Sequence, residues 1–515
     1  MEPPPQPIKV LIVPSLPFSE LRQLGREGAV GLLVPGVGPT TNRRQALASL
    51  VRGELENARL GGVPNGPVLI STSAADAIPR RRPLIVVSLP PRGRPGLNDR
   101  RYPMAVLGYG YHGLLVSPTT RIPGLVSMVD IAPTALGRAR GGLTSKPTES
   151  AGLAVRRLDR QISANNTLKL PALLVVGLVV ALLGVARPRA ALSALPVALA
   201  TNIVLGAAGI TNVAVMLVGL AACTAAGGLT LARVLKSELL LLALFVLLLL
   251  GCAATMAFEP EWFAVAPLGP TQNSRFYGVG NQIETLLLAP VLAGAVLAAR
   301  RFGVVGYIGF ALLALVTVAD NNFGSDGGGA VVLGVGFAVL GARLARLRAR
   351  GVAVSLLASA AVVGALVRYD LHQSRPDHLR SAFSGGIGGL LAVARNRIPL
   401  AYEPAFDQWY LVGPAALGFA IATFAVLRTA RSRLQRDLVL VAVVSVLTSL
   451  IVNDSAAYVL IGGIAVLAAA GRPMLPEPGA RRVAFARVPL GRPATEVVGP
   501  ASTLGPLRHA DPEKL

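Results

Sequence analysis

The sequence predicts an α-helical polytopic membrane protein of about eleven transmembrane helices, preceded by a small N-terminal α/β domain. Two observations predict the membrane region: 53% of the 515 residues are hydrophobic and only 15% are charged. Charged residues approach a quarter of an ordinary soluble chain, so this composition belongs to a membrane protein. The third observation is a series of short β-branched runs before residue 120, separated by Gly and Pro, which is typical of strands alternating with helices.

Composition divides the chain into three parts. Residues 1–167 are of mixed composition and are the expected α/β domain, residues 168–471 are the expected transmembrane helical domain, and residues 472–515 are rich in Pro and Arg. The last part is expected to be a disordered basic cytoplasmic tail.

The formal charge of +23 is better explained by basic cytoplasmic loops than by nucleic acid, because aromatic residues are only 5% of the chain. The arginines are also scattered between apolar runs. The bilayer is therefore the expected partner, and nucleic acid is not expected. The two cysteines, Cys223 and Cys252, fall inside apolar runs and indicate no disulfide framework.

The apolar part divides at charges and turn residues into segments near the length of about 20 residues that a bilayer requires. The expected spans are 168–186, 190–209, 212–232, 238–257, 283–299, 303–319, 328–345, 351–368, 409–427, 437–452 and 455–471.

The loops between these spans differ in charge from one side to the other. One set is rich in Arg and almost free of acids, and the other holds most of the acids. By the positive-inside rule, the basic set is cytoplasmic. This pattern predicts a multi-pass protein of the cell membrane with extracytoplasmic polar loops and a cytoplasmic C-terminus. An odd number of spans then favours an α/β domain outside, but the first residues have no signal-peptide pattern. A start of the chain upstream of Met1, a cytoplasmic domain and a span count that differs by one are the alternatives.

A segment of the N-terminal part, GLVSMVDIAPTAL at 124–136, resembles the end of alkaline phosphatase/sulfatase-type domains. The resemblance covers about the first 140 residues and implies an enzyme with two metals, held by several Asp and His, and a Ser, Thr or Cys nucleophile. This chain departs from that pattern. It offers one histidine, His112, and Asp76, Asp99 and Asp130 lack paired ligand spacing. We expect an inactive domain in which Asp130 caps a helix.

Most of the chain is similar to bacterial polytopic membrane proteins that join such a degenerate domain to a membrane region with an Arg-Phe/Tyr-Tyr-Gly-hydrophobic-Gly-Asn loop. The matching segment here is RFYGVGN, residues 275–281. The similarity implies an architecture and no established activity.

Four outward loops are unusually dense in Asn, Asp, Arg and His, namely 258–284, 320–329, 369–408 and 452–458. Each taken alone is explained as a solvated turn. Four on one face favour a shared extracytoplasmic site, because functional groups concentrate on loops held by a rigid scaffold.

Chemical type assigns roles within this site. Arginines clamp phosphate or pyrophosphate, and a histidine beside an aspartate is an oriented base; ion pairs with neighbouring acids and an exposed loop histidine are the plainer alternatives. The expected catalytic residues are Arg275, His378, Asp377, Glu261 and Asp320. The expected substrate-binding residues are Asn273, Tyr277, Asn281, Asn321, Asn322, Arg375, Arg380, Asn453 and Asp454. A divalent cation suits oxygen ligands at Glu259 and Asp326, and the sequence leaves any cofactor unidentified.

These observations favour an envelope enzyme that transfers a glycan or phosphoryl-linked group from a polyprenyl-type lipid carrier. The layout is similar to that of O-antigen ligase/polymerase-type and lipid-carrier glycosyltransferase membrane proteins, in architecture only. A transporter or flippase for an anionic or lipid-linked solute is the first alternative. A non-catalytic assembly partner is the second.

Overall fold

The computed structural model describes residues 8–36, 40–52, 70–72, 83–108, 110–137, 141–270, 276–372, 408–453 and 455–470. Over these ranges a small α/β domain is followed by a bundle of helices. Eight described helices are long and apolar enough to cross a membrane, and two shorter apolar helices, Ala349–Ala365 and Ala456–Ala470, accompany them. The chain therefore has the character of an integral membrane protein.

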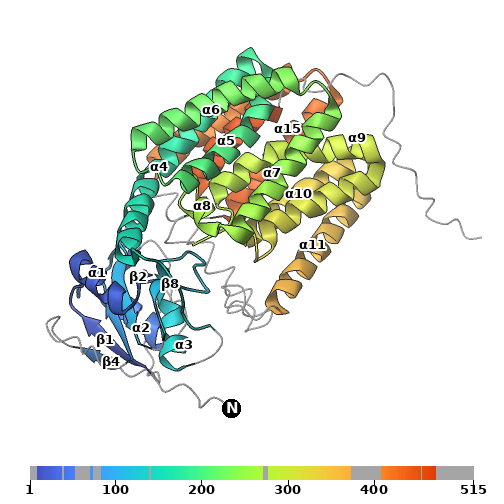
Figure 1. Ribbon diagram of the computed structural model, residues 1–515. Helices are drawn as coiled ribbons and strands as arrows, with labels where there is room; N and C mark the ends of the chain where they lie inside the picture. The colour runs from blue at the N-terminus through green and yellow to red at the C-terminus, as the bar shows by residue number, and fades with distance from the viewer. Residues whose placement is uncertain are drawn as a thin grey trace, which may run out of the picture. The chain divides into compact units, whose positions relative to one another are not determined.

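A mixed sheet forms the centre of the α/β domain (Figure 1). Its strands follow the order β10-β8-β2-β7-β5-β1-β4, with β9 beside β2. β1 is parallel to β4 and β5, whereas β7 is antiparallel to β2 and β5. The strands are β1 (Lys9–Val13), β2 (Gly28–Val34), β4 (Ile70–Thr72), β5 (Leu84–Ser88), β7 (Tyr102–Leu107), β8 (Gly113–Val116), β9 (Leu125–Ser127) and β10 (Thr144–Lys146); β3 (Thr40–Thr41) and β6 (Gly96–Leu97) pair separately.

Helices cover both faces of this sheet, and successive side chains of a strand point to opposite faces. Alternate residues of one strand therefore pack in two different apolar clusters. Val10 and Ile12 of β1 pack in one apolar cluster with α2 (Arg43–Arg52) and α3 (Ile131–Ala135). Leu11 and Val13 pack in a second cluster with α1 (Phe18–Glu27) and the first half of α4 (Ala151–Ala186). The near-continuous apolar strands follow from this double covering.

The long helix α4 belongs to both parts of the molecule. It has 36 residues, about 54 Å at 1.5 Å per residue, whereas the hydrocarbon core of a bilayer is about 30 Å thick. Val155 and Leu158 pack against the sheet, and Leu173 and Val176 pack inside the bundle. Figure 1 shows α4 leaving the sheet and entering the bundle. The boundary expected at residue 167 therefore falls inside one continuous helix.

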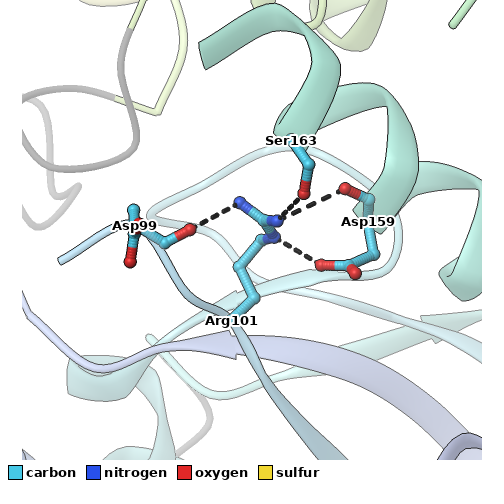
Figure 2. A network of polar contacts seen from close by, with 4 residues as sticks. All are labelled: Asp99, Arg101, Asp159 and Ser163. Atoms are coloured by element: carbon cyan, nitrogen blue, oxygen red, sulfur yellow. Dashed lines mark hydrogen bonds and ion pairs between the residues drawn. The ribbon is translucent and has the colours of Figure 1, made fainter. Parts of the chain in front are cut away.

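A buried arginine attaches α4 to the sheet domain. The Nε of Arg101 donates to Oδ1 of Asp159 on α4 at 2.6 Å, and its Nη2 donates to the Asp159 carbonyl and to the Ser163 hydroxyl. Its Nη1 donates to the Asp99 carbonyl at 3.2 Å. Figure 2 shows these four residues around the guanidinium. The Arg101 side chain is only 3% exposed, so this ion pair is better shielded from solvent than a surface pair.

The bundle contains the remaining helices. They are α5 (Pro188–Ala208), α6 (Val213–Val234), α7 (Glu238–Phe258), α8 (Pro260–Ala264), α9 (Asn281–Ala319), α10 (Gly327–Leu344), α11 (Ala349–His372), α14 (Trp409–Thr429), α15 (Arg433–Val452) and α16 (Ala456–Ala470). The apolar core of the bundle draws on each helix from α4 to α10 and on α14, α15 and α16.

The element α9 reverses direction at Gly303. This residue has φ 65° and ψ −149°, a region that is essentially reserved for glycine. The Phe310 ring lies against Gly294, 16 positions earlier, whereas 16 residues of a straight helix would span about 24 Å. The two halves of α9 are therefore antiparallel helices joined by a one-residue turn.

The two ends of the bundle differ in their polar contacts. We call the end at which α4 enters from the α/β domain the domain end, and the opposite end the distal end. At the distal end Asp437 of α15 pairs with Arg343 of α10 and Arg433, and Glu238 of α7 pairs with Arg300. These pairs use the arginines that the sequence assigns to basic loops.

Candidate functional site

Two loops expected from the sequence to be polar meet at the domain end of the bundle. The Tyr277 hydroxyl donates to Oδ1 of Asn321 at 2.7 Å, and the Ser325 hydroxyl reaches the same oxygen at 3.2 Å. The backbone N–H of Val279 donates to the Gly324 carbonyl at 2.9 Å. Two predicted substrate-binding residues, Tyr277 and Asn321, are thus in direct contact.

Close approach of these loops depends on Gly278. This residue has φ 84°, and a Cβ atom there would collide with the Gly324 carbonyl oxygen. Only glycine combines that backbone conformation with the absence of a side chain. Gly278 therefore allows loop 276–280 to lie on loop 320–326.

A third polar segment, the end of α15, reaches the same end of the bundle. Nδ2 of Asn453 donates to Oε2 of Glu284 at 2.8 Å and to Oγ of Ser449 at 2.8 Å, and the Ser449 hydroxyl lies 3.3 Å from Oε1 of Glu284. A Cβ atom on Gly328 would collide with Oδ1 of Asn453 and lie 3.5 Å from Oδ1 of Asp326. We call Glu284, Asp326, Ser449 and Asn453 the polar cluster.

The polar cluster is buried. Glu284 and Asp326 are each 1% exposed. Glu284 lies in the first turn of α9, where the helix dipole favours an anion, and Asp326 is the N-cap residue of α10. Two acids thus enter the bundle at helix N-termini, which lowers the cost of their burial. The sequence predicted a role for Asn453 and Asp326 but missed Glu284 as a site residue.

The expected catalytic residue Asp320 shapes its own loop. One carboxylate oxygen accepts from the N–H of Asn322 at 2.7 Å, and its carbonyl accepts from the N–H groups of Phe323 and Ser325 at 3.0 Å. Such side-chain to backbone bonds fix a turn. In this structure Asp320 and Asn322 hold the turn that presents Asn321.

Glu259 and Glu261 form a pair of carboxyl groups beside α8. Burial raises the pKa of Glu261, the negative charge of Glu259 raises it further, and Lys146 of β10 lowers it. The sequence expected a cation between Glu259 and Asp326. Within the described ranges no group of three or more His, Cys, Asp or Glu side chains lies close enough together to hold a metal ion.

Lys169 of α4 is a buried cation that the sequence analysis missed. Its side chain is 2% exposed, and its Nζ donates to the Pro270 carbonyl at 2.7 Å. Pro270 lies against Gly280, the N-cap of α9, whose carbonyl accepts from the N–H of Glu284. Lys169 is therefore near the start of the helix that carries Glu284.

One helical turn before Lys169, Asn165 is 3% exposed, and neither polar atom of its side chain has a hydrogen-bond partner in the described part of the chain. Residues four apart lie on the same face of a helix. A buried ammonium with one carbonyl partner and a buried amide with none are costly unless they serve a ligand. The only sequence signal was one charge at the edge of an apolar run.

Seven of the expected site residues lie outside the described ranges. They are Asn273, Arg275, Arg375, Asp377, His378, Arg380 and Asp454. Their predicted roles stay predictions. Asn281, by contrast, is the first residue of α9, next to the meeting point of the loops.

In the α/β domain, Asp130 is the N-cap residue of α3, but its side chain does not cap the helix as expected. Its carboxylate accepts from the hydroxyls of Ser117 and Thr119 and from the N–H of Thr119, and it makes no side-chain bond to the N-terminus of α3. Burial raises its pKa to about 6 against these hydrogen bonds, which lower it. His112 is exposed, and the Asp130 carboxylate bonds within the turn at 117–119.

Comparisons with protein-family models, with curated proteins and with solved structures found no match to this chain.

Proposed function

We propose that this chain is an integral membrane protein of the bacterial cell envelope with eleven spans and an extracytoplasmic domain end. The reversal of α9 at Gly303 supports two spans in place of one, and the two shorter apolar helices add two more. The distal end carries the arginines of α10 and α15, which the positive-inside rule assigns to the cytoplasm.

The activity we infer is the transfer of a glycan or phosphoryl-linked group from a polyprenyl-type lipid carrier. One observation carries this inference: polar loops far apart in the sequence converge on the buried polar cluster at one end of an apolar bundle. A lipid-linked donor has its headgroup at that depth and its chain in the bilayer. Such a donor would meet the cluster without leaving the membrane.

The residues of the site suit this chemistry. Lys169 and the amide of Asn165 would bind a phosphate oxygen of the carrier, since cation and amide donors both favour an anion. Glu284 would accept the proton of the acceptor hydroxyl as general base. As the bond to the acceptor oxygen forms, the bond to the carrier phosphate breaks, and Lys169 balances the charge left on the phosphate.

A matched pair of glutamates tests the proposal. Purified protein in lipid nanodiscs is supplied with radiolabelled polyprenyl diphosphate-linked sugar and a mixture of glycan acceptors. Glu284→Gln should reduce turnover by at least about 100-fold, the range of a lost general base. Glu238→Gln, in the first turn of α7 at the distal end, should leave turnover within about twofold of the wild-type rate. Equal turnover by the wild type and Glu284→Gln would contradict the proposal.

Transport of an anionic or lipid-linked solute is the second candidate, because ionisable groups inside a bundle often mark a solute pathway. Glu284 and Lys169 are such groups. Proteoliposomes that accumulate a labelled anionic solute, lose uptake in Glu284→Gln and show no covalent product would favour transport over transfer.

A further inference from the structure

We propose that the α/β domain is a positioning module for the polar loops of the bundle, and that Arg121 makes the connection. Arg121 lies in the turn after β8 and has φ 59°. A non-glycine residue in the left-handed region costs energy, so the surrounding structure must hold it there. The reason for holding it is visible in its contacts.

The guanidinium of Arg121 contacts both polar loops. Its Nη1 donates to the carbonyl of Asn321 at 2.6 Å and its Nη2 to Oδ1 of the same residue at 3.3 Å, across 200 positions of sequence. Its central carbon lies 4.0 Å from the centre of the Tyr277 ring, well within the range of a cation–π interaction. One side chain of the α/β domain therefore fixes the pair that joins loop 276–280 to loop 320–326.

The turn that presents Arg121 is held by Asp130. The carboxylate of Asp130 accepts from Ser117 and from both the hydroxyl and the N–H of Thr119. The Ser117 carbonyl in turn accepts from the N–H of Arg121 at 2.9 Å, and its hydroxyl accepts from the N–H of Thr120. The aspartate of VDIAPT, which the sequence suggested to be a remnant of a hydrolase motif, thus organises residues 117–121.

An apolar contact accompanies these polar ones. Val265 and Phe276, which flank the loop before α9, belong to the same buried cluster as Leu158 and Ile162 of α4. The α/β domain, α4 and the segment before α9 therefore share one buried apolar cluster beside the polar contacts. This inference goes beyond the proposed function, since it concerns the position of the loops and holds for transfer or transport.

Hydrogen exchange of the complete protein in nanodiscs tests the inference without an activity assay. In Arg121→Ala the N–H groups of Val279 and Ser325, which bond within the two loops, should exchange at least about tenfold faster, because a bond to a charged group is lost. The N–H groups shared by β2 and β7 should exchange at the wild-type rate. His112→Ala, an exposed change in the same domain, is the control and should alter neither set.

A second variant separates positioning from general loss of fold. Asp130→Asn keeps the size of the side chain but removes one acceptor, and it should speed exchange at Val279 and Ser325 in the same direction as Arg121→Ala. Combining both changes should give little further effect, since they act through one turn. Unchanged exchange at Val279 and Ser325 in Arg121→Ala, or multiplied effects in the double variant, would overturn the inference.

The two proposals fail in different ways. Faster loop exchange in Arg121→Ala, together with no transfer by the wild type, would leave the positioning role standing and remove the proposed enzyme. Transfer lost in Glu284→Gln, with unchanged loop exchange in Arg121→Ala, would do the reverse.

Discussion

Lys169 is expected to lower the stability of the protein and to serve its function. A buried ammonium whose described partner is one carbonyl oxygen carries a desolvation cost that the fold does not recover. A hydrophobic side chain of similar length avoids that cost. The residue is therefore expected to be retained for binding and not for packing.

The change Lys169→Met should raise the free energy of unfolding by about 1–4 kcal/mol, the range for replacing a buried ion pair by well-packed apolar residues, and should abolish turnover. Thermal unfolding in nanodiscs and the transfer assay measure the two effects. Lys236→Met, at an exposed position of the distal end, should change stability by less than about 0.5 kcal/mol. A destabilised Lys169→Met would show that the lysine is a structural tie to Pro270.

Asp130 makes the stability of the α/β domain depend on pH. Its pKa is raised from 3.8 to about 6 in the fold, so the protonated form is favoured there. The contribution of Asp130 to the free energy of unfolding is fully present below about pH 4 and is lost as the pH rises through 6. At 1.36 kcal/mol per pKa unit, the loss amounts to roughly 3 kcal/mol. Infrared detection of sheet unfolding at pH 4–7 measures this slope. Subtracting the Asp130→Asn profile isolates it; identical profiles would contradict the assignment.

At the scale of elements, the reversal of α9 depends on the backbone conformation of one residue, Gly303. Gly303 has a backbone conformation that other residues avoid, yet a Cβ atom there would meet nothing within 4 Å. The cost of a side chain is therefore one of backbone conformation alone. A substitution at Gly303 therefore measures the cost of the φ and ψ angles without a contribution from side-chain packing.

Gly303→Ala should lower the free energy of unfolding by about 1–3 kcal/mol, the cost of one residue in a forbidden region. Gly251→Ala is the matched control: it lies inside α7, and its Cβ atom would also meet nothing within 4 Å. That change should be neutral or stabilise by up to about 1 kcal/mol, since alanine favours a helix. Unfolding of both variants in one lipid makes the comparison; equal stabilities would show that the turn is not fixed by Gly303.

Sequence reasoning worked for elements and for classes of residue, and it failed for single contacts. Apolar runs predict membrane helices because length and composition are enough to identify a span. Arg300 and Arg301 marked the end of the span that precedes Gly303. The polar loops could be recognised as a group, and two residues predicted from them, Tyr277 and Asn321, are in contact; their predicted roles stay predictions. Arg121 was missed because nothing local links it to a loop 200 positions away.

At the scale of the whole molecule, the charge difference between the two ends predicts the orientation in the membrane. The domain end carries acids at buried and loop positions, and the distal end carries arginines paired with Asp437 and Glu238. Because basic loops stay in the cytoplasm, we expect the α/β domain and the polar cluster to face outward together.

Cysteine labelling checks this orientation in a background in which Cys223 and Cys252 are replaced by alanine. Ser325→Cys should react with an impermeant thiol reagent added outside intact cells, and Ala349→Cys should react only after the membrane is opened. Ser325 is half-buried in the turn before α10, and Ala349 is the exposed first residue of α11. External labelling of Ala349→Cys alone would invert the topology.

Because α4 is continuous, the rotation of its first half relative to its second half determines where the α/β domain lies relative to the polar loops. Arg101 holds one end of α4 to the sheet, and the other end is packed in the bundle. Each residue inserted into an α-helix rotates one half relative to the other by about 100° and separates the two by a further 1.5 Å or so, roughly the rise of one residue. A single extra residue near position 165 would therefore swing the whole α/β domain, and Arg121 with it, away from Asn321. The number of residues in α4 therefore fixes the rotation of the α/β domain relative to the bundle. A flexible linker would tolerate an inserted residue, whereas an insertion in α4 would disrupt the polar loops as a substitution within them does.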